Sequence, residues 1–243
     1  MTLWDLLFTN QKSAPPEFGL WYFFLPASLL VVGYFSIKYA QSKSYQRFWY
    51  WAQLIQVLTI NAWYILAHMP LTDNLPFYHC RLAMLAILFA PRGTYIKQYF
   101  ALLGVLGSIA ALVYPAFDPF PFPHITVLNL VFSHWALFAN SLIYLQDFYQ
   151  SEKQDSLRIV KITFGMNALI FLVNLLTKGD YGFLRRPPII GDHGALLNYL
   201  LVSIVMVAGI CLVNQRYKYK YKMGVAHSVS SGSVCVVTYS LHQ

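Results

Sequence analysis

The chain has 243 residues, of which 58% are apolar and only 11% are charged. A soluble domain carries about a quarter charged residues, so the composition excludes an ordinary water-soluble protein and predicts a helical membrane protein. The net charge of +8 does not predict nucleic-acid binding, because the basic residues fall in short loops between apolar runs, where the positive-inside bias places them.

Apolar runs follow one another along the chain and approach the ~20 residues that a helix needs to cross about 30 Å of hydrocarbon, although the third run is short. We predict an all-α bundle of about seven transmembrane helices in a single domain, residues 1–222. The predicted spans are Phe18–Tyr39, Phe48–His68, Leu75–Phe89, Ile96–Tyr114, Ile125–Leu145, Leu157–Leu176 and Ala195–Val213. The tail, residues 223–243, lacks a helical period, and we expect it to be disordered.

The loops also predict the orientation of the chain in the membrane. One side carries twelve basic residues and the other carries four, and the positive-inside rule assigns the richer side to the cytoplasm. The richer side holds Lys38, Lys43, Arg47, Arg92, Lys97, Lys153, Arg158, Lys161, Arg216, Lys218, Lys220 and Lys222, and the poorer side holds Lys12, Lys178, Arg185 and Arg186. We expect a multi-pass protein of the cell membrane with its N-terminus outside, its C-terminus in the cytoplasm and no cleavable signal peptide.

Polar residues gather in the half of the bundle that we place outside. Five histidines and one cysteine fall there, namely His68, His79, Cys80, His124, His134 and His193. An ionisable residue within a membrane is costly and by default marks a functional site. His134 is the strongest case, because it lies inside the segment LVFSHWALF, well below any interface, and needs a partner there.

Each of these residues also has a plainer interpretation. The histidines at helix ends are common at membrane interfaces, and His79 can face headgroup water. Cys80 can be a small buried apolar residue, and His134 can make an ordinary interhelical hydrogen bond. Arg81 can extend to outer phosphates as an interfacial cation.

Other polar and small residues predict close helix packing. One face of the fifth span carries Asn129, Ser133, Ala136 and Asn140, and one face of the sixth carries Asn167 and Asn174. We interpret both stripes as packing contacts between helices rather than as substrate contacts, and Gly104 with Ser108 as a close helix crossing.

Two kinds of chemistry fit the histidine–cysteine set. In the first, a nearby imidazole generates or stabilises the thiolate of Cys80, which then acts as a nucleophile in acyl transfer. In the second, His68, His79, Cys80 and His134 supply three or four ligands to a metal. No HxxH or HxxxH spacing supports the metal site, so we rank it lower and predict no metal and no cofactor. The spacing of Cys80, Cys211 and Cys235 predicts neither a disulfide framework nor a zinc ribbon.

Three segments, LPFYHCRLAM, FPHITVLNLVFSHW and GFLRRPP, resemble the bacterial YwaF-type integral membrane proteins, which are relatives of the eukaryotic transmembrane protein 164 group. In the family pattern, LP-x-x-x-C opens a helix, an FPH segment leads to an internal S-H, and an N-x-x-[FY]-L-[RK] type loop lies near the last span. The likeness covers roughly residues 20–215 and leaves the tail outside.

The resemblance implies a seven-helix bundle and, from the eukaryotic branch, a cysteine-dependent acyltransferase that remodels phospholipids. It assigns the nucleophile to Cys80 and the assisting histidine to His134. His79 fits the pattern less well, because bacterial relatives often have their histidine one position earlier, where this chain has Tyr78.

The leading hypothesis is therefore an integral membrane protein with an outer-leaflet site that acts as a thiol-dependent phospholipid acyltransferase. Cys80 is the expected nucleophile and His134 the expected general base. The expected substrate contacts are Arg81, as the anchor of a lipid phosphate, together with His79, His193 and Asn198. The alternative is a non-enzymatic transporter, permease-type or partner-binding membrane protein in which the same cluster lines a cavity. Membrane lipids are the expected partners, and the sequence predicts no oligomeric state.

Overall fold

The computed structural model of the protein describes residues 2–17, 19–189 and 191–230, and within these residues the chain folds into helices joined by short loops. The α-helices there are α1 (Leu3–Phe8), α2 (Phe24–Lys38), α3 (Lys43–Leu66), α4 (His79–Phe89), α5 (Tyr95–Val113), α6 (Ile125–Phe148), α7 (Ser156–Thr177) and α8 (Ala195–Ser230). The 3₁₀ helices η1 (Gly19–Phe23), η2 (Ser151–Lys153) and η3 (Tyr181–Phe183) lie between them. The prediction of an all-α fold is confirmed.

The lengths and compositions of the helices are those of a polytopic integral membrane protein. In the described part of the chain, α5, α6, α7 and the Ala195–Tyr221 part of α8 are long and apolar enough to cross a membrane. Helices α2 and α4 are apolar but shorter. A helix occupies each of the predicted spans, whereas the number of crossings and the orientation remain predictions.

Local sequence signals explain where the first helices depart from the predicted spans. α1 was not anticipated; a capping box closes its first turn, in which the Thr2 hydroxyl and the Asp5 carboxylate each accept a backbone amide of the other residue. α2 begins later than predicted because residues 19–23 form η1. α3 begins earlier because the Ser42 hydroxyl accepts a hydrogen bond from the Tyr45 amide and caps the helix.

Two later helices depart from prediction more strongly. α4 begins at His79 instead of Leu75, because Pro76 disfavours helical backbone at the residue before it and has no amide hydrogen of its own. α8 continues past Val213 to Ser230, so residues 223–230 of the predicted disordered tail are helical. The rest of that tail, residues 231–243, lies outside the described residues.

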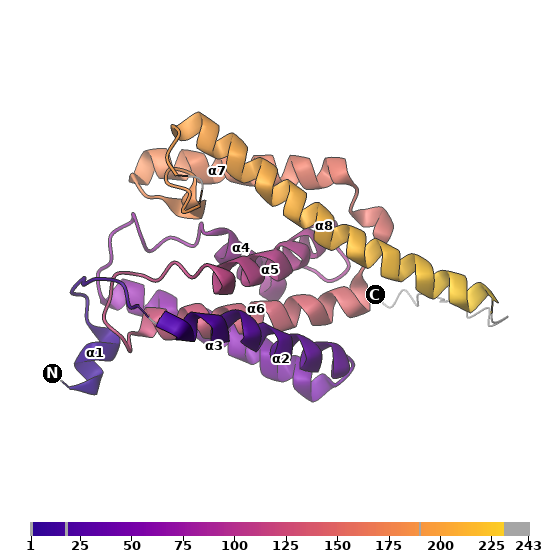
Figure 1. The fold of residues 1–243 in the computed structure, drawn as a ribbon, viewed down its shortest axis with the longest axis horizontal. Helices are drawn as coiled ribbons and strands as arrows, with labels where there is room; N and C mark the ends of the chain where they lie inside the picture. The colour runs from indigo at the N-terminus through magenta and orange to yellow at the C-terminus, as the bar shows by residue number, and fades with distance from the viewer. Residues whose placement is uncertain (1, 18, 190, 231–243) are drawn as a thin grey trace.

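Helix α6 is the centre of the bundle and packs against α2, α3 and α5. α4 packs on α5, and α8 packs on α5 and α7. Figure 1 shows α7 and α8 as a pair that lies across the α4–α5 side of the bundle, with α8 projecting beyond the other helices at one end. At the opposite end lie α1 and the connection that carries η3 (Figure 1), and this is the end that the charge pattern places outside.

Helices α5 and α6 make a close contact at Gly104. A Cβ built on Gly104 would lie 2.2 Å from the Ser141 Oγ and 3.0 Å from the Leu137 Cδ1, so the two backbones approach as closely as they do only because residue 104 is a glycine. The predicted close crossing is therefore present, and its partner is α6.

Polar side chains also join the helices, as the packing interpretation of the asparagine stripes predicted. The Asn140 amide donates to the Trp49 carbonyl of α3 at 2.9 Å. The Trp135 indole of α6 donates to the Ser28 hydroxyl of α2 at 2.7 Å. Each bond satisfies a polar group that water cannot reach inside a membrane.

An N-terminal strap, residues 8–13, runs across the predicted outer end of the bundle. Its contacts are the Phe8 carbonyl with Trp63 Nε1 at 3.4 Å, the Thr9 carbonyl with His124 Nε2 at 3.0 Å, Lys12 Nζ with Asp73 Oδ2 at 3.2 Å and the Ser13 amide with the Pro119 carbonyl at 2.8 Å. The strap therefore ties the end of α3 to the loops that precede α4 and α6.

The α5–α6 contact yields a test of the packing. Gly104→Ala should lower the free energy of unfolding by about 1–3 kcal/mol, because the added methyl group must displace Ser141 or Leu137. Gly165→Ala in α7 is the matched control, since a Cβ there meets nothing within 4 Å, and it should raise stability by about 0.5–1 kcal/mol. Thermal unfolding in detergent measures both, and equal effects of the two substitutions would contradict this packing.

Candidate functional site

The candidate site begins where α4 begins, inside the bundle. A Cβ built on Gly107 of α5 would lie 2.8 Å from the Cys80 sulfur, so the thiol packs directly on that glycine. At 1.5 Å per residue, Gly107 lies about 18 Å from the Tyr95 end of α5 and about 9 Å from its Val113 end. The first turn of α4 therefore lies within the apolar length of α5 rather than at its outer end.

This first turn presents three polar side chains in three directions. Successive residues of a helix point about 100° apart, so His79, Cys80 and Arg81 face different neighbours. His79 reaches Asn167 of α7, Cys80 packs on α5, and Arg81 reaches Tyr64 of α3. The N-cap residue, Tyr78, makes no side-chain cap bond, so the positive end of the α4 dipole acts on this turn without a capping oxygen.

His79 serves as a link between helices. Its Nε2 lies 2.7 Å from Asn167 Oδ1, an oxygen that only accepts, so Nε2 donates. The Asn167 amide group donates in turn to the Ser203 hydroxyl at 2.9 Å, which joins α4, α7 and α8. The ring also packs against Gly182 of η3. This position requires glycine, because its φ is +66° and because a Cβ there would collide with the His79 ring. The predicted substrate contact at His79 stays a prediction, but its imidazole does not face headgroup water.

His134 has a defined proton arrangement. Its Nδ1 lies 2.6 Å from the Leu130 carbonyl, one turn earlier on α6. A carbonyl oxygen only accepts, so the Nδ1 of the neutral ring carries the proton and Nε2 carries the lone pair. The partner that this buried histidine needs is thus its own backbone rather than another helix. Within the described residues, no hydrogen bond joins its ring to the Cys80 thiol, but Cys80 and Leu130 both pack against the hydrophobic cluster that contains Leu137.

Arg81 belongs to a polar cluster that reaches the outer loops. Its Nη2 donates to the Tyr64 hydroxyl at 2.6 Å, and that hydroxyl donates to Asp118 Oδ2 at 3.4 Å. The guanidinium lies over two tyrosine rings, 4.8 Å from the centroid of Tyr64 and 5.2 Å from that of Tyr78. Its Nη1 is buried and has no hydrogen-bond partner among the described residues.

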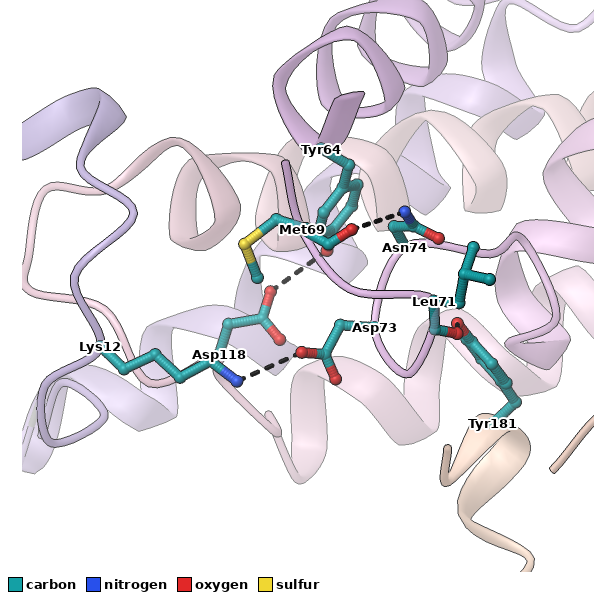
Figure 2. Close-up of polar contacts among 8 residues, drawn as sticks. All are labelled: Lys12, Tyr64, Met69, Leu71, Asp73, Asn74, Asp118 and Tyr181. Carbon is teal, nitrogen blue, oxygen red and sulfur yellow. Dashed lines mark hydrogen bonds and ion pairs between the residues drawn. The ribbon is translucent and has the colours of Figure 1, made fainter. Parts of the chain in front are cut away.

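Figure 2 shows how the outer side of this cluster is built. Tyr64 points from the end of α3 toward Asp118, and Lys12 of the strap runs beside Asp118 to Asp73. The loop that carries Asp73 is bonded to η3, because the Tyr181 hydroxyl donates to the Leu71 carbonyl at 2.6 Å and accepts from the Leu75 amide at 2.9 Å.

Sequence reasoning did not identify Tyr64 or Asp118 as site residues. Tyr64 lies in an apolar run in which nothing marks it, and it is the position of α3 beside α4 that makes it the partner of Arg81. Asp118 did carry a signal, because it is the single charged residue in the loop segment YPAFDPFPFPH. A lone acid among prolines and aromatic residues next to a predicted polar cluster is a reasonable candidate for a partner of that cluster.

His193 and Asn198 lie elsewhere, at the start of α8. The Asn198 amide donates to the Arg185 carbonyl at 2.7 Å and to Asp192 Oδ1 at 3.0 Å, and its oxygen accepts from the His193 amide at 3.0 Å. These bonds fix the loop before α8. His193 and the residues after it line a groove of about 380 Å³, and no hydrogen bond in the described residues joins this region to the Arg81 cluster.

His124 has structural surroundings. His124 is fully buried, and its Nδ1 accepts from the Thr126 amide as the N-cap of α6. In the described parts of the chain, no group of three or more histidine, cysteine, aspartate or glutamate side chains gathers as metal ligands.

An apolar groove lies on the α2 side of α6. Its volume is about 460 Å³, and its lining consists of Phe24, Leu25, Phe117, Phe122, Val127, Leu128, Val131 and Phe132. Such a lining suits an acyl chain rather than a polar solute.

The comparisons with known proteins give one match. The model of the TMEM164 family matches residues 8–218, which includes the strap, the Arg81 cluster, Cys80 and His134. Neither a curated protein nor a solved structure matches the chain.

Asp118 gives a prediction for the pH dependence of stability. Burial raises its pKa above the ordinary 3.8, although the charge of Arg81 and the Tyr64 hydrogen bond oppose the shift. The folded state thus binds this proton more tightly than the unfolded state, so the contribution of Asp118 to stability is largest below 3.8 and falls as the pH rises toward its folded pKa. Relative to Asp118→Asn, the wild type should lose melting temperature from acid toward neutral pH.

The control for this measurement is Asp192, whose pKa is lowered because the Gly194 amide donates to its carboxylate. Asp192→Asn should show the opposite and smaller trend, with the wild type losing stability relative to the variant as the pH falls. Thermal unfolding in detergent across the acid range tests both, and a wild type that gains stability over Asp118→Asn with rising pH would contradict a raised pKa.

Proposed function

The chain belongs to the TMEM164 family, and on that premise we propose that this integral membrane protein is a thiol-dependent phospholipid acyltransferase of the cell membrane. Cys80 is the nucleophile, His134 the general base and Arg81 the anchor for a lipid phosphate. The expected substrates are membrane phospholipids, which reach the site from the outer leaflet.

The observation that carries the proposal is the proton arrangement of His134. The Leu130 carbonyl fixes the proton on Nδ1, so Nε2 is left as an accepting nitrogen, and Leu130 and Cys80 pack against the same apolar cluster. A base of this kind and a thiol in the first turn of an uncapped helix are the two groups that thiol-based acyl transfer requires. The hydrogen bond between a base and its nucleophile is often long in a free enzyme and shortens with substrate.

The proposed reaction has two halves, in which a phospholipid gives up an acyl group and a hydroxyl-bearing acceptor takes it. His134 Nε2 takes the thiol proton, and the Cys80 sulfur attacks the ester carbonyl carbon of a phospholipid. The bond from that carbon to the glycerol oxygen breaks, His134 returns the proton to this oxygen, and a lysophospholipid leaves an acyl thioester behind. An acceptor hydroxyl then gives its proton to His134 and attacks the thioester, and the released sulfur regains the proton.

Arg81 supports this reaction through charge. A guanidinium binds a phosphate through parallel N–H donors, and its Nη1 has no other partner in the described residues. Because Arg81 follows Cys80 in the chain, a phosphate held there would fix the position of the ester relative to the thiol. The apolar groove beside α6 offers a place for an acyl chain.

A second candidate, a permease-type protein, is favoured by polar atoms buried between α3, α5 and α6. In the described residues, both amide atoms of Gln53 and the side-chain polar atoms of Trp49, Ser108 and Ser141 have no hydrogen-bond partner. Such atoms suit a polar path through the bundle. This candidate predicts that the acyl composition of membrane phospholipids does not depend on Cys80.

Substitution of Cys80 tests the acyltransferase. Wild-type protein should carry a hydroxylamine-sensitive acyl group on Cys80, and Cys80→Ala should shift the acyl composition of membrane phospholipids. His134→Gln should slow acyl transfer about 10²–10⁴-fold, the usual contribution of a general base. Mass spectrometry of the Cys80 peptide and of extracted lipids provides the readouts. Absence of acylation together with unchanged lipids would contradict the proposal.

Gly107 tests the position of the thiol separately from its chemistry. In Gly107→Ala the added methyl group would lie 2.8 Å from the Cys80 sulfur and should displace it, so we expect acyl transfer to fall about 10²-fold for a shift of about 1 Å. Gly165→Ala serves again as the control, because its Cβ meets nothing within 4 Å. Initial rates on a fluorescent phospholipid distinguish the two, and normal activity of Gly107→Ala would show that the thiol position is not critical.

A further inference from the structure

The far end of α8 carries a concentrated positive charge. Its basic segment, RYKYKYK at residues 216–222, has four basic residues among seven, and the helix has no aspartate or glutamate from Ala195 to Ser230. The apolar stretch Ala195–Tyr221 has 27 residues, which makes it about 40 Å long and longer than the ~30 Å of hydrocarbon. The basic segment therefore reaches the level of the lipid headgroups, and Figure 1 shows that this end of α8 projects beyond the other helices.

A ring contact fixes how the basic segment is turned. The Tyr217 ring lies 5.5 Å from the ring of Tyr149, the residue that follows α6, so this side of α8 faces the bundle. Successive residues of a helix point about 100° apart. Arg216 and Lys218 consequently point to opposite flanks of this contact, and Tyr219 points away from the bundle and is 59% exposed.

The charges of Arg216 and Lys218 are not used within the protein. Other cations at this end are bonded, because Lys153 donates to a backbone carbonyl of the α4–α5 loop and Lys220 donates to Gln146 Oε1 at 2.7 Å. In the part of the chain that the structure describes, no hydrogen bond or ion pair joins the side chain of Arg216 or Lys218 to another residue. Both side chains can therefore bind an anion from outside the protein.

We propose that the basic segment, chiefly through Arg216 and Lys218, binds the headgroups of anionic phospholipids in the leaflet at that end of α8. The charge pattern places this leaflet on the cytoplasmic side, where membranes are negatively charged. The exposed rings of Tyr219 and Tyr221 favour a lipid over a soluble polyanion, because tyrosine prefers the membrane interface. The inference is independent of the proposed function, since it involves none of the residues of that reaction.

A preference for anionic over zwitterionic headgroups is the specific consequence. Phosphatidylglycerol and phosphatidylcholine with the same acyl chains differ in net headgroup charge, so the apolar contacts of α8 contribute equally to both. Each basic side chain near an anionic surface contributes about fivefold in binding. The preference should weaken as salt is added, because screening acts on exposed charges.

The experiment uses the full chain in detergent with equal amounts of dioleoyl phosphatidylglycerol and dioleoyl phosphatidylcholine. Native mass spectrometry measures the ratio of the two bound lipids. Wild-type protein should retain more phosphatidylglycerol, and the double variant Arg216→Gln/Lys218→Gln should lower the ratio about fivefold or more. The variant Arg216→Lys/Lys218→Arg keeps both charges and should keep the ratio.

The matched control is Lys178→Gln/Arg186→Gln, which also removes one lysine and one arginine from exposed positions, but at the other end of the bundle. Arg186 already interacts with the charge of Asp192, and Lys178 lies two positions before Asp180. Because each of these cations has an acid nearby, the control should change the ratio little.

An unchanged ratio in Arg216→Gln/Lys218→Gln overturns the proposal, as does an equal fall in the control. A fall in the charge-conserving variant would contradict a site based on charge. Displacement of bound phosphatidylglycerol by an equimolar short oligouridylate would identify a soluble nucleic acid as the partner and overturn the lipid assignment. Thermal unfolding checks that each variant is folded, as we expect for side chains that have no bonds within the described residues.

Discussion

Helix α4 starts inside the bundle, and the polar groups of its first turn must therefore find partners on other helices. A helix leaves its first amide hydrogens without internal partners, and hydrocarbon offers no water to replace them. The connection before α4 consequently descends into the protein instead of staying at its surface. Tyr181 of η3 holds this connection through two hydrogen bonds of its hydroxyl, and its backbone is bonded to Asn174 of α7.

The same constraint separates the side chains that are adjacent in sequence. His79 is bonded to Asn167 of α7 and Arg81 to Tyr64 of α3, whereas Cys80 has no polar partner in the part of the chain that the structure describes. Two of the three side chains thus fix the helix in place, and the Cys80 thiol is left to react. A rigid first turn of this sort is what an active thiol requires, because small errors in its position cost large factors in rate.

Much of the fold follows from local patterns, and much of the site does not. The apolar runs predicted the helices from α2 to α8, and Gly104, Asn140 and Asn167 predicted contacts between helices, because small and amide side chains have few other uses inside a membrane. The start of α4 depended on Pro76, and the continuation of α8 into a basic segment had no apolar signal. The apolar periodicity alone therefore could not predict these two helix boundaries.

The site depended on pairings between distant segments. Tyr64 and Asp118 are separated by 54 positions in the chain, and His79 and Asn167 by 88, so no local pattern connects them. The charge pattern did place Lys12 on the same side as the histidine cluster, but its pairing with Asp73 depended on the path of the strap. The Cys80 and His134 assignments came from their positions in the predicted spans and from a resemblance; the described geometry supplies the tautomer of His134 and leaves their chemistry to experiment.

Helix α8, in contrast to the site, is constrained little by contacts within the protein. Only 17% of its most apolar stretch is buried within the protein, against 56% in α5. Lipid tails accept leucine, isoleucine, valine and phenylalanine almost equally, so most of α8 is free to diverge between lineages as long as it stays apolar. Helix α5 must fit Gly104 and Gly107 against its neighbours and has no such freedom. The sequence of α8 should therefore diverge much faster within this family than the sequence of α5.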